Sequence, residues 1–348
     1  MNDFPEVSVI ITVYDRDKYI YSAINSVLNQ TLDPSKYEIL VVGKLENKEI
    51  LDFLRRERIM FIENKERAIG PKIVDALKMA KGRIISFLED DDLFHPDKLE
   101  TVIENFSHDK KIGFMSHPLH IIDNENNHNT LSNTGYQSIY IDKNKPDKKE
   151  RFLKAWKQGS KARYTASTVS ILKDILVENI GYLQHVNFSP DSFYIFVSFK
   201  SKYNMIYSDR NLGDFRMSMH SLSKNLEELG NFIKHKKLYS FYFCLDYLNY
   251  KQMLQETELK QFITGASLFH KIYYNIYNSN RDNRCSLSMN EMFKWMMGIP
   301  DYSLKHWYDR FYPFISRMPW FIRLQFIKKS FERHRKGYLS LLEERSIS

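Results

Sequence analysis

The sequence has few of the features that mark secreted or membrane-spanning proteins. Its 348 residues include two cysteines, Cys244 and Cys285, which cannot make the several cross-links of a disulfide-stabilised domain. No stretch approaches the roughly 18 consecutive apolar residues that suggest a transmembrane helix. The first residues lack the basic and apolar regions of a signal peptide. We therefore expect a cytoplasmic protein in a reducing compartment.

The composition is that of a soluble globular protein, with 43% hydrophobic and 27% charged residues. The length allows one large domain or two ordinary ones. The net charge of +8 suits an anionic partner, such as nucleotide phosphates, an acidic lipid surface or nucleic acid.

An acidic segment follows an apolar run near the end of the first hundred residues. The run covers residues 84–88, and residues 89–92 read Glu-Asp-Asp-Asp. Gly82 and Pro96 bound the segment, so the run is predicted to be a buried strand. Four carboxylates repel one another unless a positive group lies among them, and Mg²⁺ or Mn²⁺ takes such oxygen ligands together with substrate phosphates. The alternative is a solvated acidic turn before a helix N-terminus.

Strands and helices are predicted to alternate over these hundred residues. Apolar, β-branched runs predict strands at residues 7–14, 37–42, 59–63 and 84–88, and helical spacing of apolar residues predicts helices at 19–29, 49–56 and 72–79. The alternation indicates an α/β fold with a mostly parallel sheet. Ligands of such sheets bind at the carboxyl ends of the strands, which places Thr12, Tyr14 and residues 89–92 around one crevice.

These segments resemble the family 2 glycosyltransferases, inverting enzymes of the GT-A fold that use nucleotide-sugar donors. The matching segments, in the family's order and spacing, are residues 7–14, 23–31, 37–42, 80–82, 87–92 and 96–99. The resemblance is strong to about residue 105, patchy to about 225 and absent beyond. It implies a Rossmann-like GT-A domain over residues 1–225, followed by an α-helical region over residues 226–348.

The resemblance assigns roles to residues of the predicted crevice. Asp91 matches the ligand of a Mn²⁺ or Mg²⁺ ion, and Asp90 matches the position near the nucleoside ribose. Thr12 and Tyr14 match the positions that flank the base. For Tyr14 an aromatic at the edge of the core is the structural alternative.

The sequence departs from the family pattern on the nucleotide side. Gly43 stands where similar proteins carry an aspartate that contacts the base, so uracil is not expected to be recognised in the usual way. Ile73 and Val74 replace an Arg-Asn pair. Lys72 and Arg67 are the nearby cations for the diphosphate, and the alternative for each is a solvated surface charge.

Two later segments resemble the catalytic and closing parts of the family. Asp191 occupies the place of the general base, although Pro190 replaces the glutamate before it, and both residues also suit a helix start. A base takes the proton from the attacking hydroxyl, and a single carboxylate there implies inversion. The second segment has an aromatic-Arg pair followed by a His-x-x-Ser pattern. The resemblance implies that Arg216 and His220 close over the diphosphate and that His220 contacts the metal. A structural histidine is the alternative.

The C-terminal third changes in character. Apolar residues at helical spacing predict amphipathic helices between residues 238 and 297, and residues 307–342 interleave aromatic with basic residues. This mixture fits an ordinary helical bundle with a solvated basic face, and it also fits peripheral contact with an acidic membrane surface. No motif supports a nucleic-acid partner.

The sequence therefore predicts a metal-assisted inverting glycosyltransferase. It would move a sugar from a nucleoside-diphosphate sugar to a hydroxyl of a glycan or a lipid-linked glycan, in the cytoplasm at the inner face of the membrane. One alternative is a catalytically silent GT-A-like scaffold protein. A nucleotidyltransferase is disfavoured because the loop after the first predicted strand, at residues 13–17, contains no glycine.

Overall fold

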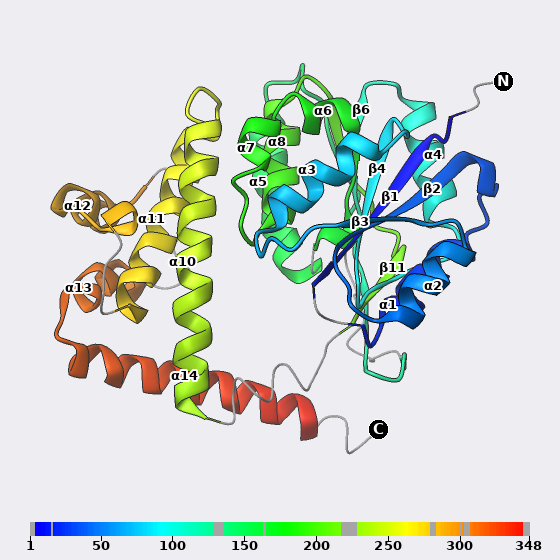
Figure 1. Cartoon of the computed structure of the whole chain (residues 1–348). Coiled ribbons are helices and arrows are strands. Elements are labelled where there is room, and N and C mark those ends of the chain that lie inside the picture. Colours follow the sequence, from blue (N-terminus) through cyan, green and yellow to red (C-terminus); the bar gives the residue numbers. More distant parts are fainter. Residues whose placement is uncertain are drawn as a thin grey trace. The chain divides into compact units, whose positions relative to one another are not determined.

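A computed structural model of the protein describes residues 4–14, 17–127, 136–162, 165–216, 228–278, 283–299, 301–302 and 307–343. The chain divides into two compact units, Met1–Met217 and Ser218–Ser348 (Figure 1). The boundary predicted at residue 225 falls among residues 217–227, outside the described residues, and it remains a prediction.

The first unit is built on an eight-stranded sheet with the strand order β3-β2-β1-β4-β9-β6-β10-β8. At its centre β1 pairs in parallel with both β2 and β4. The predicted α/β class with a mostly parallel sheet is confirmed. The strands of this sheet are β1 (Val7–Tyr14), β2 (Tyr37–Lys44), β3 (Met60–Glu63), β4 (Ile84–Glu89), β6 (Ile112–Ser116), β8 (Ile139–Ile141), β9 (Ser170–Leu172) and β10 (Asn204–Tyr207).

Helices flank this sheet as the alternating pattern predicts (Figure 1). One hydrophobic core joins alternate residues of β1, such as Val9 and Ile11, to the buried faces of α1, α2 and α4. The helix α3 begins at Ile69, three residues before the predicted start, because Pro71 is tolerated in a first turn. The helices of this unit are α1 (Ile20–Leu28), α2 (Lys48–Arg56), α3 (Ile69–Met79), α4 (Lys98–His108), α5 (Lys148–Ala162), α6 (Lys173–Val177), α7 (Ile180–Leu183) and α8 (Pro190–Lys200).

A second, three-stranded sheet follows the acidic segment. Its order is β5-β11-β7, from β5 (Leu93–Phe94), β11 (Gly213–Arg216) and β7 (His120–Ile122). Before β9 the chain forms a 3₁₀ turn at Ala166–Thr168. This turn carries Ser167, a residue of the site described below.

The second unit is helical, as predicted. Its helices are α10 (Leu229–Met253), α11 (Lys260–Tyr277), α12 (Met289–Met297), α13 (Tyr312–Arg317) and α14 (Trp320–Glu343). A hydrophobic core of its own includes Phe232 of α10, Ile272 of α11, Trp295 of α12 and Ile327 of α14. None of the described helices is long and apolar enough to cross a membrane.

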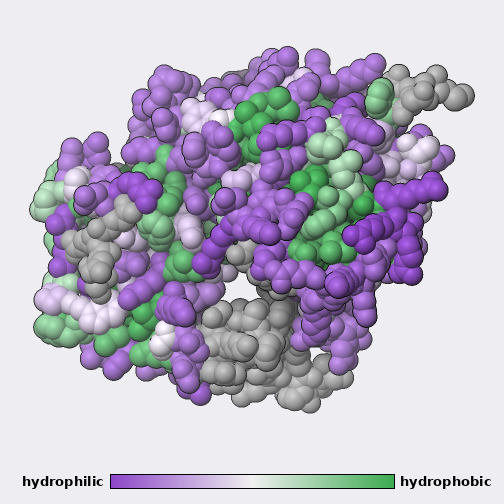
Figure 2. Space-filling model, in the orientation of Figure 1, coloured by the Kyte–Doolittle hydropathy of each residue, from purple (hydrophilic) through white to green (hydrophobic). Residues whose placement is uncertain are grey.

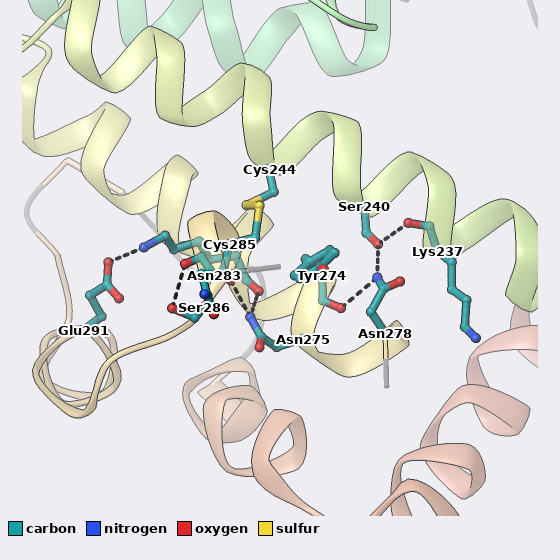
Figure 3. Close-up of a disulfide and its surroundings, with 11 residues drawn as sticks. Lys237, Ser240, Cys244, Tyr274, Asn275, Asn278, Asn283, Cys285, Ser286 and Glu291 are labelled. Carbon is teal, nitrogen blue, oxygen red and sulfur yellow. Dashed lines mark hydrogen bonds and ion pairs between the residues drawn. A yellow bond between two sulfur atoms is a disulfide. The ribbon is translucent and has the colours of Figure 1, made fainter. Parts of the chain in front are cut away.

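Cys244 of α10 and Cys285, in a 3₁₀ turn, form a disulfide within this unit (Figure 3). Both cysteines are buried. Asn275 of α11 donates a hydrogen bond from Nδ2 to the Cys285 carbonyl oxygen at 2.7 Å, which holds the turn against α11. The number of cysteines in the sequence did not indicate that these two meet.

Candidate active site

The acidic turn, residues 89–92, lies at the carboxyl end of β4, beside the carboxyl end of β1. The strand register sets Thr12 next to Glu89, and Thr12 is half-buried there. The chain then reverses in a turn in which the Asp92 N–H donates to the Glu89 carbonyl oxygen at 3.2 Å. The parallel pairing of two buried strands thus places the four acidic residues at the edge where ligands of such sheets bind.

Asp92 anchors this turn to the rest of the unit. Its side chain is buried, and both oxygens accept hydrogen bonds: Oδ2 from the Ser167 hydroxyl at 2.6 Å and Oδ1 from the Arg216 N–H at 3.0 Å. Burial, with the neighbouring Asp91 carboxylate, raises the pKa of Asp92 to about 7. Asp92 therefore holds the turn in place.

Lys98, in the first turn of α4, places a buried amino group beside the acidic turn. Its ammonium donates to the Ser167 carbonyl oxygen at 2.6 Å and lies 3.6 Å from the centre of the Phe94 ring. Burial lowers the pKa of Lys98 well below its usual range, against the opposing effect of Asp92. Neither Lys98 nor Ser167 was identified from the sequence, because nothing local distinguishes a buried lysine at a helix start from a solvated one.

The remaining members of the turn differ in their access to solvent. Asp90 is buried, whereas Asp91 and Glu89 are partly exposed. The partial exposure of Asp91 is compatible with its predicted role as a metal ligand. That role, and the role of Asp90 at the ribose, stay predictions.

The structure brings Asp191 toward this turn. Asp191 lies in the first turn of α8, where the Ser189 hydroxyl donates to its Oδ1 at 3.2 Å. Burial raises the pKa of Glu89 well above its usual range, and the charges of Asp92, Asp91 and Asp191 raise it further. The charge of Asp191 thus acts on Glu89, although 101 positions separate Glu89 from Pro190, the first residue of α8. The role of Asp191 as the base stays a prediction.

Tyr194 lies one helical turn after Asp191 and packs against β4. Its ring stacks on Phe87 of β4, with ring centres 4.1 Å apart. Burial raises the pKa of Tyr194 well above its usual range, and the charges of Asp191 and Glu89 add to the effect. The stacking fixes α8 against β4 and with it the position of Asp191.

Arg216 ties three segments together. Its Nε donates to the Asp91 carbonyl oxygen at 2.9 Å, Nη1 to the Asp123 carbonyl oxygen at 2.6 Å and Nη2 to the Asn126 side-chain oxygen at 2.6 Å. Its guanidinium also lies over the Tyr19 ring, 4.3 Å from the ring centre. These contacts position the acidic turn. A contact between Arg216 and a diphosphate stays a prediction, and His220 lies outside the described residues.

The nucleotide side of the crevice is shaped by Gly43. Its φ is +142°, and a Cβ added there would lie 1.9 Å from the Val13 carbonyl oxygen. The missing aspartate therefore reflects a backbone that tolerates no side chain at this position. Lys72 of α3 is buried below β1, with its ammonium 3.5 Å from the same Val13 oxygen. Tyr14 pairs with Lys44 in the sheet, and its side chain lies outside the described part of the chain.

Comparison with known proteins agrees with this geometry. The sequence model of "Glycosyl transferase family 2" matches residues 8–176. The chain is 29% identical over 137 residues to chondroitin synthase of Escherichia coli, an alignment covering 38% of this chain and 19% of that protein. It is 32% identical over 101 residues to the poly(ribitol-phosphate) beta-glucosyltransferase of Bacillus spizizenii, covering 27% of this chain and 16% of that protein. The aligned parts span 19–26% of the length of the first three curated relatives.

The fold is also that of solved structures. The crystal structure of S. aureus TarS 1–349 in complex with UDP superposes with a TM-score of 0.51 at 13% identity, over 96% of this chain and 91% of that one. The same TarS fragment in complex with UDP-GlcNAc gives a TM-score of 0.50 over 97% of this chain. At this identity the likeness establishes the fold alone.

Proposed function

We propose that the chain transfers a sugar from a nucleoside-diphosphate sugar to a hydroxyl of a glycan or lipid-linked glycan, because residues 8–176 match the sequence model of glycosyl transferase family 2 and the fold is that of GT-A glycosyltransferases. The observation that supports the proposal is the stacking of Tyr194 on Phe87, which packs the helix of Asp191 against the strand that leads into the acidic turn. The complexes of TarS with UDP and UDP-GlcNAc support this class of donor. The names of the two enzymes above support an acceptor of the polysaccharide kind.

A divalent cation fits the acidic turn. Burial, and after it the repulsion between neighbouring carboxylates, raises the pKa of Glu89 and of Asp92, so a cation bound there would favour the charged forms of these groups. Mn²⁺ or Mg²⁺ accepts carboxylate ligands and substrate phosphates together. Asp91 would hold the ion, with His220 as a second ligand. When bound, the ion would neutralise the charge that develops on the leaving diphosphate.

The chain's own residues supply binding and proton transfer. Asp191 takes the proton from the acceptor hydroxyl while that oxygen attacks the sugar carbon, because a neutral hydroxyl is a weak nucleophile. One carboxylate opposite the leaving group gives a single displacement with inversion. The donor is held by the base-side residues Thr12 and Tyr14, by Asp90 at the ribose, and by Lys72 and Arg216 at the diphosphate.

The test compares binding with turnover in the full-length protein. A panel of nucleoside-diphosphate sugars with Mn²⁺ is screened for thermal stabilisation, and a donor that binds is then tested with a glycan acceptor. We expect Asp191→Asn to retain donor binding and to lose 10²–10⁴-fold in turnover, the usual range for removal of a general base. Failure of every nucleotide to stabilise the protein, with or without Mn²⁺, would instead favour the catalytically silent scaffold.

We also propose that the helical unit contacts an anionic lipid surface. On α12, Met289, Phe293 and Met297 recur every four residues and are 71%, 62% and 68% exposed, so they form one apolar face. Further exposed apolar residues lie on α13 and at the start of α14, including Phe314 and Phe321. Hydrophobic surface is visible over these helices at the left edge of Figure 2.

The charges of the same helices favour lipid over a protein partner. Lys294 of α12 is exposed, as are five basic residues of α14: Lys328, Lys329, Arg333, Arg335 and Lys336. Apolar side chains beside exposed basic ones suit the interface of an anionic membrane. A lipid-linked acceptor would then be presented to the enzyme on the same surface.

Vesicle co-sedimentation tests this contact. The protein should bind phosphatidylcholine vesicles that contain phosphatidylserine and bind pure phosphatidylcholine weakly. The variant M289S/F293S/M297S should lose binding, whereas Val177→Ser, at an exposed apolar position of α6, should retain it. If the triple variant instead abolishes a concentration-dependent dimer and vesicles are not bound, the surface is an interface between copies of the chain.

A further inference from the structure

Two histidines and an aspartate meet on the small sheet, outside the site described above. His120 begins β7, Asp214 lies beside it on β11, and His95 directly follows β5. The strand register pairs Asp214 with His120 on one side and with Leu93 of β5 on the other. One of the three side chains comes from β7, one from the central strand β11 and one from the residue directly after β5. They lie close together.

Their distances match a metal-binding cluster. His95 Nε2 lies 2.9 Å from Asp214 Oδ1, and His120 Nδ1 lies 3.8 Å from the same oxygen. Each of the three residues offers one ligand atom, and these three atoms all lie within 4.8 Å of one another. Ligand atoms bound at about 2.0–2.2 Å around one ion lie roughly 3 Å apart, so a small movement of His120 completes the geometry.

The hydrogen bonding of His95 prepares it as a ligand. Its Nδ1 lies 3.2 Å from the Asn211 carbonyl oxygen, which can only accept, so Nδ1 carries the proton and Nε2 faces Asp214. A histidine that binds a metal commonly donates its other N–H to a backbone carbonyl in this way. With the proton on Nδ1, both Nε2 and the Asp214 carboxylate oxygen are hydrogen-bond acceptors. Their close contact therefore requires a second proton or a cation between them.

The cluster is open to solvent. The side chains of His95 and His120 are 23% and 29% exposed, and that of Asp214 is 10% exposed. An ion can therefore enter, and water can complete its coordination. Two imidazoles and one carboxylate favour borderline transition metals such as Zn²⁺ or Co²⁺, whereas the all-oxygen acidic turn favours Mg²⁺ or Mn²⁺.

We propose that His95, His120 and Asp214 form a binding site for a divalent transition metal that is separate from the acidic turn. An ion there joins β5, β7 and β11. Because β11 ends at Arg216, which holds the acidic turn, the ion is placed to fix the support of the active site. The three residues are positioning residues and do not contact the donor.

Cobalt titration tests the proposal in the full-length protein, purified without a polyhistidine tag and treated with a chelator. Co²⁺ should give visible absorption, and Zn²⁺ should raise the melting temperature. The variant H95Q/H120Q should lose both responses, with metal affinity at least tenfold lower. His185→Gln, at an exposed histidine of the same unit, and Asp91→Asn, at the proposed Mn²⁺ ligand, should keep both.

The outcomes separate the metal site from a simple ion pair. If the wild type gives no Co²⁺ absorption, or if H95Q/H120Q responds as the wild type does, the proposal fails and His95 and Asp214 are only a hydrogen-bonded ion pair. Should H95Q/H120Q fail to fold, His120→Gln alone leaves the 2.9 Å contact between His95 and Asp214 intact and must still weaken Co²⁺ binding. None of these readouts requires glycosyl transfer.

Discussion

The backbone N–H of Arg216 donates to the Oδ1 atom of Asp92 at 3.0 Å, across 124 positions of the sequence. The Arg216 side chain reaches the next residue of the turn as well, through the Asp91 carbonyl oxygen. These two hydrogen bonds therefore fix β11 to the acidic turn. A change at Arg216 must alter the turn even if Arg216 never contacts a substrate.

Arg216→Lys should separate the charge of this residue from its geometry. Lysine keeps the positive charge but cannot reach the Asp91, Asp123 and Asn126 oxygens together, so partly buried hydrogen bonds are lost. We expect a loss of about 1–3 kcal/mol in stability, seen as a lower melting temperature. Arg210→Lys is the matched control, because Arg210 forms an exposed ion pair with Asp97 and should cost under about 1 kcal/mol. Equal losses in both variants would show that the buried contacts of Arg216 do not support the fold.

Asp91→Asn should stabilise the metal-free protein while abolishing its response to Mn²⁺. The Asp91 charge raises the pKa of both Glu89 and Asp92, so its removal relieves repulsion within the turn. Asp92→Asn should instead lower the melting temperature, because Asp92 accepts hydrogen bonds from Ser167 and Arg216. The measurement is thermal unfolding with chelator and with Mn²⁺. A Mn²⁺ shift that survives Asp91→Asn would remove Asp91 from the proposed metal site.

Gly43→Ala should destabilise the first unit by at least about 2 kcal/mol. The new Cβ would overlap the Val13 carbonyl oxygen in a backbone conformation that L residues rarely adopt. Gly181→Ala is the control, since no heavy atom lies within 4 Å of its added Cβ and helical alanine is favoured over glycine. Chemical denaturation of the two variants measures the difference. A neutral Gly43→Ala would mean that the strand relaxes, and that an aspartate could be restored on the base side.

Local pattern was sufficient for the first four strands of the sheet but not for the residues that support the acidic turn. The helix at Ile20–Leu28 and the strands around Thr12 and Glu89 follow from the spacing of apolar residues along a short segment. Ser167 and Lys98 take their roles from contacts with segments far away in the sequence, which leave no local signal. His95, His120 and Asp214 were missed for the same reason, because strands of two to four residues have no periodicity to read.

The disulfide between Cys244 and Cys285 should stabilise the helical unit. It closes a loop between positions 41 residues apart, and a cross-link of this size contributes about 2–4 kcal/mol by restricting the unfolded chain. A reducing agent should lower the melting temperature of the wild type and leave C244A/C285A unchanged. Alkylation of the protein before cell lysis then reports its state in the cell. Immediate labelling of both cysteines there would agree with the expected reducing compartment, and the bond would be a feature of the oxidised protein only.

His270 of α11 should make the helical unit sensitive to acid. Its ring lies among Phe243, Tyr247 and Phe269, with ring centres between 4.1 and 5.3 Å away. Burial among these rings lowers the pKa of His270 to about 3, compared with 6.5 for an ordinary histidine.

The direction of the effect follows from proton binding. Between pH 6.5 and pH 3 the unfolded chain carries a proton on this ring and the folded chain does not, so the unfolded state gains protons as the pH falls. Stability is therefore fully present above about pH 6.5 and is lost below it, by at most about 1.4 kcal/mol per pH unit. His270→Phe keeps an aromatic ring and removes the titration, so it should flatten this dependence, whereas His185→Phe should not. Proton NMR of the His270 ring gives the direct measurement, and a ring that becomes charged near pH 6.5 in the folded protein would contradict the prediction.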